Sequence, residues 1–589
     1  MTNPIQFYTQ EKAKLEQELM LLKKRLFNIS AFRFAIFVLT IFGIYYFFGN
    51  GLTISIIAFV GFSVFAFLLF LNSKFQREKE ILVSKIKINT VEIAVLNGDY
   101  KNLKTGNEFV NPNHFYSNDI DLFGVGSFYQ YSNRTATEEG AKTYAKLLTE
   151  NSIDFIETKQ NAIKELTEKV IWRQHFSAIA SLVKVEFSAK SILNYIKNYN
   201  AILPSFLTQL VKVFPPMSLI LIGLTSFGIL PFIILAVWFF VGLIISGSQV
   251  KKTSFIYNKS SKAKETFKQY YQLLNEIENQ SFSSELLKEK QQNLASETQK
   301  ASVVFQKFSK ILDSFDQRNN IVIAVFGNAF FLWDIQNGVK VEKWISKYHH
   351  TVEKWFEVIA FFDAQNTLAN FSYNHPTFVF PEINNASNII EASALGHPLL
   401  NADKRIDNDF VINKEQFFIV TGANMAGKST FLRTVSLTMV MANIGLPVCA
   451  KTIKYNPIKL ITSMRTSDSL ADDESYFYSE LKRLKFIVDT IKTEDYFIIL
   501  DEILKGTNSK DKAIGSKKFV EKLSNSKSTG IIATHDVSLC ELENELEEIK
   551  NYFFDAQINE DELHFDYTLK KGICKNMNAS FLLKKMEII

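Results

Sequence analysis

The sequence FFIVTGANMAGKST at residues 417–430 runs from an apolar segment into a loop with the spacing G-x-x-x-x-G-K-S. Glycines at both ends of such a loop let consecutive backbone N–H groups turn toward the phosphates of a nucleotide. Lys428 would then reach the β- and γ-phosphates, and Ser429 would bind Mg²⁺. The apolar run before the loop and a helical pattern after it favour a strand–loop–helix unit over a chance glycine loop.

Two further apolar runs downstream end in residues suited to nucleotide hydrolysis. Residues 496–500 lead into Asp501 and Glu502, and residues 530–534 lead into His535. Asp501 would hold Mg²⁺ through water, and Glu502 would orient or deprotonate the attacking water. His535 would sense the γ-phosphate. We expect all three strands in one parallel sheet, because ligands of such sheets gather at the carboxyl ends of the strands.

These motifs resemble those of the MutS-like ATPases of DNA mismatch repair. The Asn-Met pair inside the loop sets that family's loop apart, and Gly506-Thr507-Asn508 after the acidic pair is also similar. The resemblance implies an α/β P-loop ATPase domain of the ABC type, with a parallel sheet, preceded by an all-α core and lever domain. It implies ATP and Mg²⁺ as cofactors, Phe410 as the aromatic that stacks on adenine, and Ser475 as the serine that reaches the partner subunit's nucleotide. The residues expected to bind nucleotide are Phe410, Gly422, Asn424, Met425, Gly427, Lys428, Ser429, Thr430 and Ser475.

The resemblance covers roughly residues 90–589 and is looser in the helical part. Asp119 to Gly124 and Asn133-Arg134-Thr135 are similar to the start of the family's helical core. There are also departures from the pattern. Ala423 stands where a proline is usual, and residues 472–474 are all acidic just before Ser475, so they would repel a partner's triphosphate unless turned away or paired. We also expect no mismatch-reading domain, because only a short polar segment precedes the first apolar block.

Two apolar blocks predict membrane insertion. Residues 31–71 carry almost no charge after Arg33 and are broken once at Asn50-Gly51, which suits two spans of roughly twenty residues. Residues 214–247 contain no charged side chain, and this length is too great for one straight span and short for two. An even number of crossings keeps the segment around Asp119 on the same side as the nucleotide site, so we predict a second hairpin. Buried hairpins of a soluble protein are the alternative.

Basic flanks set the predicted orientation. Lysines and arginines precede the first apolar block and follow both blocks, whereas the Asn50-Gly51 turn has no charge. Basic flanks stay in the cytoplasm, so we expect a multi-pass protein of the cell membrane with its ATPase domain in the cytoplasm. The expected segments are a cytoplasmic N-terminal helix (1–30), transmembrane hairpin 1 (31–71), the first part of the helical core (72–204), transmembrane hairpin 2 (205–247), the lever and second part of the core (248–385), and the ATPase domain (386–589).

Composition agrees with a mixed soluble and membrane protein. The 589 residues are 47% hydrophobic and 14% aromatic, and the three cysteines lack metal or disulfide spacing, which indicates a reducing compartment. The net charge of +5 is not the signature of a nucleic-acid binder. Residues 260–310 show an amphipathic pattern that predicts one lever-like helix.

The sequence therefore predicts a membrane-anchored MutS-like ATPase. We expect ATP binding to pair two subunits through their ATPase domains, and hydrolysis to reset the helical arms. DNA is the leading ligand by resemblance, and the lipid bilayer is the other expected partner. Two alternatives remain: a membrane scaffold switched by ATP without DNA binding, and an ABC-type transporter, although the chain lacks the L-S-G-G-Q signature of that class.

Overall fold

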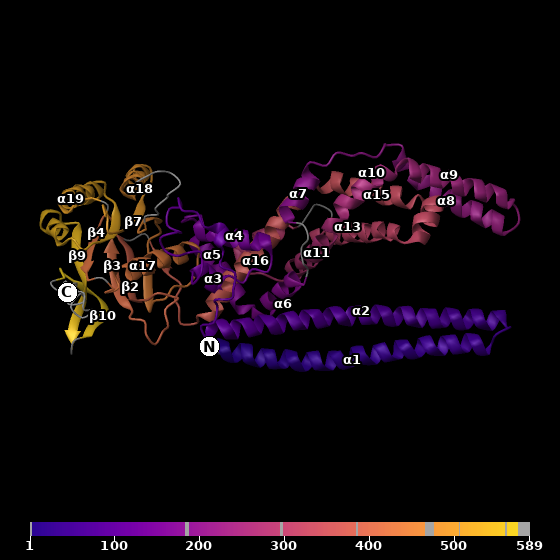
Figure 1. Ribbon diagram of the computed structural model, residues 1–589, viewed down its shortest axis with the longest axis horizontal. Helices are drawn as coiled ribbons and strands as arrows, with labels where there is room; N and C mark the ends of the chain where they lie inside the picture. Colours follow the sequence, from indigo (N-terminus) through magenta and orange to yellow (C-terminus); the bar gives the residue numbers. More distant parts are fainter. Residues whose placement is uncertain are drawn as a thin grey trace.

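The computed structural model describes residues 3–182, 188–294, 299–384, 387–423, 425–465, 476–505, 507–559 and 562–574. An α/β domain lies at one end of an elongated molecule, and two helical arms extend from it in the same direction (Figure 1). The N-terminus lies where the α/β domain meets the arms, and the C-terminus lies at the far side of the α/β domain.

The first arm is a hairpin of two long helices, α1 (Pro4–Tyr46) and α2 (Gly51–Leu96). Proline at the first position and the Asn3 side chain, which accepts a hydrogen bond from Ile5 N, start α1. Asn50 caps α2 in the same way through Thr53 N. The expected N-terminal helix and first apolar span are thus one continuous helix, and the turn between the helices lies at residues 47–50.

The second arm is built from shorter helices and carries a hairpin of α8 (Leu207–Ser226) and α9 (Phe232–Ser248) at its tip. The prediction of one lever-like helix over residues 260–310 is wrong. The chain there forms an antiparallel bundle, because the polar segments after Asn279 and Gln292 end each helix and let the next one fold back. The remaining helices of this arm are α10 (Val250–Ser260), α11 (Lys264–Asn279), α12 (Glu285–Gln292), α13 (Ala301–Asp316), the π-helix η4 (Ile323–Gly327), α14 (Asn328–Phe331) and α15 (Trp333–Tyr348).

Residues 321–331 form a further apolar segment, which lies against the hairpin of α8 and α9. It belongs to neither of the two apolar blocks of the sequence. Gly242 of α9 leaves no room for a Cβ beside the backbone of Ala329, and Phe239 packs edge-on against Phe330 with ring centroids 5.5 Å apart. Within the described residues, three helices are long and apolar enough to cross a membrane, and a bent pair that begins with α9 would make a fourth.

The helical core joins the arms to the α/β domain. Its long helix α16 (Val352–Asn374) is buried along most of its length. Asp363 on α16 accepts hydrogen bonds from the backbone of Ala136 and Thr137 and so holds the start of α4. The other core helices are α3 (Phe128–Ser132), α4 (Glu138–Thr149), α5 (Ile156–Glu168), α6 (Val170–Ser181) and α7 (Ala189–Lys197). The helical N-terminal part confirms the all-α prediction.

The α/β domain contains two sheets. The larger has the order β10-β9-β4-β8-β7-β6, and its strands are parallel except for β10. This confirms the prediction that the three strand-end motifs belong to one parallel sheet. Its strands are β4 (Phe417–Gly422), β6 (Lys459–Ser463), β7 (Tyr496–Asp501), β8 (Thr529–Ala533), β9 (Ile549–Asn559) and β10 (Glu562–Lys571).

The smaller sheet has the order β1-β5-β2-β3. Three of its strands come from the first part of the domain in sequence, before β4. Its strands are β1 (Glu382–Ile383), β2 (Asn388–Leu395), β3 (Asn408–Asn413) and β5 (Thr452–Tyr455). The helices of the α/β domain are α17 (Lys428–Asn443), α18 (Tyr476–Thr490), α19 (Ser509–Asn525) and α20 (Leu542–Glu545).

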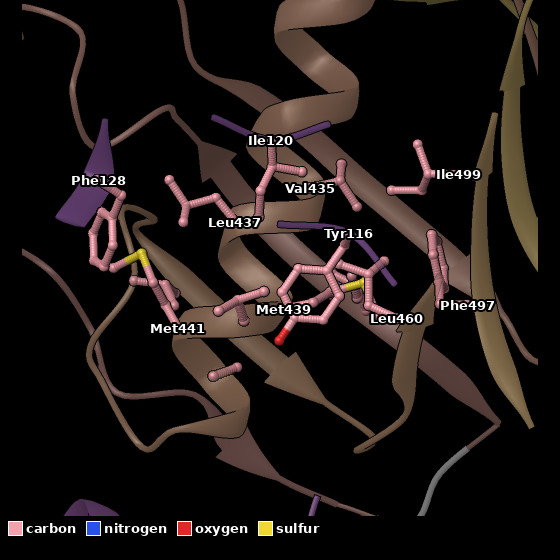
Figure 2. Close-up of a cluster of buried hydrophobic side chains, with 14 of the residues drawn as sticks. Tyr116, Ile120, Phe128, Val435, Leu437, Met439, Met441, Leu460, Phe497 and Ile499 are labelled. Atoms are coloured by element: carbon pink, nitrogen blue, oxygen red, sulfur yellow. The ribbon is translucent and has the colours of Figure 1, made fainter. Parts of the chain in front are cut away.

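The α/β domain and the helical core share one hydrophobic core. Figure 2 shows Tyr116, Ile120 and Phe128, from the segment that opens the helical core and the start of α3, beside side chains of α17. The Tyr116 hydroxyl also donates to Leu148 O at 2.8 Å. Because α17 begins at the phosphate loop, the segment that opens the helical core rests directly on the helix that follows the nucleotide site.

Candidate nucleotide-binding site

The phosphate loop connects β4 to α17 with two residues that require glycine. Gly422 and Gly427 have φ values of +145° and +107°. A Cβ on Gly422 would lie 2.6 Å from the carbonyl oxygen of Phe554, and one on Gly427 would lie 3.1 Å from the Tyr567 ring. The loop therefore passes close to both β9 and β10. Asn424 lies outside the described residues.

Lys428 is folded back onto its own loop. Its ammonium donates to Gly422 O at 2.7 Å and to Ala423 O at 3.0 Å. Burial lowers the pKa of this buried lysine, while Glu502 and Asp501 oppose that shift. An ammonium has three donors and no acceptor, so at most one N–H remains for another acceptor until a phosphate replaces a carbonyl.

Ser429 and Asp501 meet at the carboxyl edge of the sheet. The Ser429 hydroxyl donates to Asp501 Oδ2 at 2.6 Å, which places two hard oxygen ligands side by side. Mg²⁺ prefers oxygen ligands and takes the remainder of its octahedron from substrate phosphates and water. The donor set therefore fits Mg²⁺. Among the described residues no cluster of three or more His, Cys, Asp or Glu side chains could hold a metal by itself.

Glu502 and His535 form the tightest polar contact of the site, with Oε1 2.5 Å from Nε2. The hydrogen bond from His535 holds the pKa of Glu502 at about 2, despite the opposing effect of burial. His535 Nε2 is also 3.4 Å from the Lys428 ammonium. An ionised carboxylate can only accept, so we assign the Nε2 proton to the bond with Glu502, and Nε2 then accepts nothing from the ammonium. The predicted phosphate lysine, base and sensor thus lie in one group.

The two remaining exposed positions of the loop are Met425 and Thr430. Met425 is 77% exposed and has a left-handed backbone with φ +68°. Thr430 lies in the first turn of α17, and its carbonyl accepts a hydrogen bond from Thr434 at 2.8 Å. Ser475 and the acidic residues before it lie outside the described residues.

The structure corrects the assignment of Phe410 as the base-stacking residue. Phe410 is only 1% exposed, and its ring packs edge-on against Phe418 and Phe431. Residues alternate between the two faces of β3, and Phe410 lies on the face that covers the core. No face of the ring is free for a base.

Tyr567 on β10 is an aromatic residue at the mouth of the site, and it begins the segment from Tyr567 to Gly572 that resembles the end of the MutS-like ATPases. Its side chain is 44% exposed and its ring lies against Gly427. Asn408 fixes this part of β10: its amide donates to Tyr567 O at 3.1 Å, and its side-chain oxygen accepts from Leu569 N at 2.7 Å. The signal in the sequence was an aromatic residue close to Gly572.

Glu480 on α18 is a second residue whose role emerges only in the structure. This buried carboxylate accepts hydrogen bonds from the backbone N–H groups of Leu504 and Lys505, and burial raises its pKa. It thereby ties α18 to the loop that follows Glu502. Leu504 has φ +59°, a conformation that needs such support.

Asp119 and Asp121 connect the site to the helical core. Asp119 accepts hydrogen bonds from the Thr462 hydroxyl at 2.5 Å and from Arg465 N at 2.9 Å. Asp121 receives both terminal nitrogens of Arg465, at 2.6 and 2.8 Å, and lies 3.6 Å from Arg433 of α17. A shift of α17 or of β6 would therefore move the segment that opens the helical core.

Comparison with known proteins agrees with this geometry. Residues 418–585 match a family model described as MutS domain V. A DNA mismatch repair protein MutS of Finegoldia magna is 30% identical over 272 residues, which cover 45% of this chain and 30% of that protein. The MutS protein homolog 4 of Homo sapiens is 30% identical over 203 residues, or 33% of this chain and 21% of that protein. The matched region thus spans less than a third of either relative's length.

Proposed function

We propose, from the membership of this chain in the MutS family, that the protein is a membrane-anchored ATPase whose nucleotide cycle rearranges its helical arms, and that it acts on DNA. One observation carries the ATPase assignment. Lys428, Ser429, Asp501, Glu502 and His535 come from three separate strand ends and meet in one site.

Each residue has a defined role in the proposed cycle. Lys428 exchanges its loop carbonyls for the β- and γ-phosphates of ATP, and the loop N–H groups bind the same phosphates. Ser429 and Asp501 hold Mg²⁺, which neutralises the phosphate charge when bound. His535 turns from Glu502 toward the γ-phosphate, and the released carboxylate then orients the attacking water. Tyr567, rather than Phe410, supplies the aromatic surface for the base.

We propose that two copies pair through the ATPase domains when ATP is bound. The phosphate loop is open on the side of Met425, which a second subunit could cover. Closure would press on α17, whose Arg433 contacts Asp121 and the carbonyl of Asp119. The movement would reach the arms through the shared core of Figure 2. The first step of this movement is transmitted by direct contacts between α17 and the segment that contains Asp119 and Asp121.

The arms are the proposed membrane anchors, with the ATPase domain in the cytoplasm. Both hairpin tips lie at the end of the molecule away from the α/β domain (Figure 1). Phe48 at the first tip is 86% exposed and Phe227 at the second is 84% exposed, and other large apolar side chains surround them. Surfaces of this kind mark contact with lipid or protein. Parallel hairpins could enter one bilayer together.

A membrane scaffold switched by ATP is the second candidate function. The observation that favours it is the same pair of apolar tips, because arm ends that lie in the bilayer are not available to bind DNA. In this case ATP would control self-association at the membrane, and nucleic acid would not be a ligand.

Binding of the nanodisc-held protein to fluorescent DNA separates the two candidates. The substrates are paired, mismatched, branched and single-stranded DNA, each with and without ATP across a salt series, with Lys428→Ala as the matched variant. ATP-dependent binding that persists at physiological salt and is lost in Lys428→Ala supports action on DNA. Only weak, salt-sensitive binding identical in both proteins would refute it and leave the scaffold.

A further inference from the structure

A cavity of about 670 Å³ lies where the first arm meets the helical core, remote from the nucleotide site. One face of α2 forms one wall, since its lining positions from Gln76 to Glu92 recur every three or four residues. The opposite wall comes from α6, α16 and the chain around Arg134. This volume is typical of pockets for small organic ligands.

Part of the cavity lining is apolar. It includes Val83, Ile88 and Val91 of α2, together with Leu103 and Leu182. Val83 is one of the large apolar side chains that remain exposed in this structure. Water in such a space gains few hydrogen bonds, so an apolar ligand body would displace it favourably.

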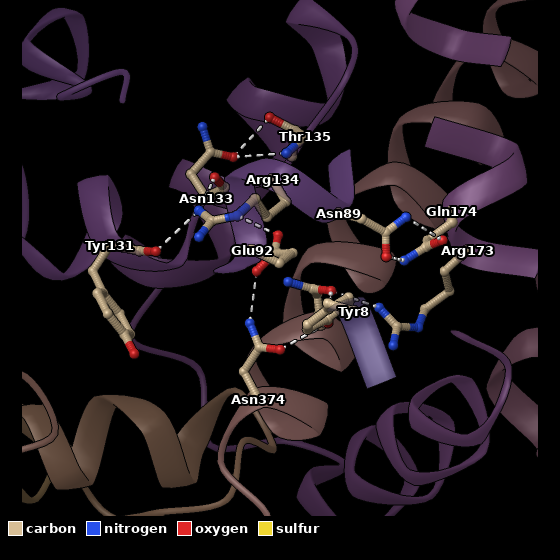
Figure 3. A network of polar contacts seen from close by, with 11 residues as sticks. Tyr8, Asn89, Glu92, Tyr131, Asn133, Arg134, Thr135, Arg173, Gln174 and Asn374 are labelled. Atoms are coloured by element: carbon tan, nitrogen blue, oxygen red, sulfur yellow. Dashed lines mark hydrogen bonds and ion pairs between the residues drawn. The ribbon is translucent and has the colours of Figure 1, made fainter. Parts of the chain in front are cut away.

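The charges around this apolar space are unbalanced. Five cationic side chains and only two carboxylates line the cavity. Of the carboxylates, Glu92 is already engaged: Arg134 lies 2.6 Å from its Oε1, and Asn374 donates to its Oε2 at 2.8 Å (Figure 3). Within the described part of the chain, neither Lys87 nor Lys104 forms an ion pair. The cavity therefore presents excess positive charge.

Two side chains of the cavity lining have buried polar atoms without hydrogen-bond partners. Arg173 is 3% exposed; it donates to Leu166 O and Asn370 Oδ1, but its Nη2 has no hydrogen-bond partner. Both amide atoms of Asn366, also 3% exposed, lack partners. Among the described residues no carboxylate forms an ion pair with this buried guanidinium, and burial lowers the pKa of Arg173 although the more distant Glu92 opposes that shift. An anionic group beside Arg173 would relieve the cost of its burial.

We propose that this cavity binds an anionic amphiphile, a molecule with one phosphate or carboxylate group and an apolar body. The anion is held by Arg173 with Lys87 and Lys104 nearby, and the apolar body lies along Val83 and Ile88. Because α2 and the helical core form opposite walls, a bound ligand fastens the first arm to the core. It thereby stabilises the same junction as the Asn89–Gln174 hydrogen bonds in Figure 3.

The test is binding of decyl phosphate to the full-length protein held in phosphatidylcholine nanodiscs, counted by native mass spectrometry. Two further probes separate the contributions: decyl glucoside lacks the charge, and inorganic phosphate lacks the alkyl chain. Two variants alter the cavity in different ways. The double variant Lys87→Gln/Lys104→Gln removes positive charge, and Val83→Trp fills part of the volume. Lys101→Gln, an exposed lysine near the cavity that does not line it, is the matched control.

We expect saturable binding of one decyl phosphate, weakened about tenfold or more in both variants and unchanged in Lys101→Gln. Decyl glucoside and inorganic phosphate should each bind at least about tenfold more weakly. Equal binding by all variants, or no saturable binding, would overturn the proposal. Nanodiscs containing phosphatidylglycerol then identify the source: competition with decyl phosphate indicates a bilayer lipid, and no competition indicates a soluble amphiphile.

Discussion

The carboxylate of Glu502 accepts a hydrogen bond from His535, with Oε1 2.5 Å from Nε2. This bond holds the pKa of Glu502 at about 2. A carboxylate of such low basicity takes a proton from water poorly. We therefore infer that this pairing is a resting arrangement, and that hydrolysis begins when His535 exchanges Glu502 for the γ-phosphate.

The Glu502→Gln variant should lose ATP turnover while keeping nucleotide affinity. The amide keeps the shape of the side chain but cannot act as a base, so kcat should fall by about 100-fold or more. Steady-state hydrolysis and binding of a fluorescent ATP analogue measure the two properties separately. Glu547→Gln, an exposed glutamate of the same domain, should behave like wild type. Undiminished turnover in Glu502→Gln would remove the assigned base.

The Asp501→Asn variant should need more Mg²⁺. Asp501 accepts the Ser429 hydroxyl at 2.6 Å, and a neutral amide holds a divalent cation less well than a carboxylate does. We expect the Mg²⁺ concentration for half-maximal hydrolysis to rise about tenfold or more. A titration of hydrolysis rate with Mg²⁺ at fixed ATP measures this. An unchanged midpoint would show that Asp501 does not support the metal.

Two aspartates of one loop should differ sharply in their effect on stability. Asp119 is buried and satisfies the Thr462 hydroxyl and Arg465 N, so Asp119→Ala should lower the free energy of unfolding by about 2–4 kcal/mol. Asp121 forms a partly exposed ion pair with Arg465 and has φ +51°, a conformation that asparagine also tolerates, so Asp121→Asn should cost less than about 1 kcal/mol. Denaturant unfolding of both variants measures the contrast. Similar losses of unfolding free energy in the two variants would contradict the contacts described for Asp119 and Asp121.

Asp363 should make stability depend on pH. Burial raises its pKa to about 6 from 3.8, so the folded protein binds this proton more tightly than the unfolded chain. Its contribution is complete below the unfolded pKa and is lost as pH rises through about 6. The difference in unfolding free energy between wild type and Asp363→Asn should therefore fall between about pH 4 and pH 7, by at most about 3 kcal/mol. A flat difference for Asp363→Asn would refute the assignment.

The site was largely predictable because its motifs are local. A strand that runs into a glycine loop or an acidic pair fixes the position of Lys428, Ser429 and Asp501 within a few residues. The role of Phe410 depends instead on which face of β3 meets the core, and that is decided by pairing with β2. The motif therefore indicated the right segment and the wrong side chain.

Long-range contacts account for what the sequence could not predict. Asp119 and Arg465 are 346 residues apart, and no pattern in either segment indicates the other. The bundle of α11 to α13 was read as one helix because each helix repeats the same amphipathic period. Residues 321–331 give no membrane signal in the sequence because an apolar segment of that length is too short for a span. Only their packing on α9 shows that they belong to the apolar tip.

Single cysteines at the two hairpin tips should label from the side of the membrane opposite the ATPase domain. Phe48 and Phe227 lie at the turns and are strongly exposed, whereas the natural cysteines, Cys449, Cys540 and Cys574, are buried and give little background. In intact cells, a membrane-impermeant maleimide should modify Phe48→Cys and Phe227→Cys. Lys101→Cys, beside the helical core, should react only after the membrane is opened. Equal labelling of Phe48→Cys and Lys101→Cys in intact cells would mean that the first hairpin does not cross the bilayer, and labelling of Phe48→Cys without Phe227→Cys would confine the crossing to the first arm.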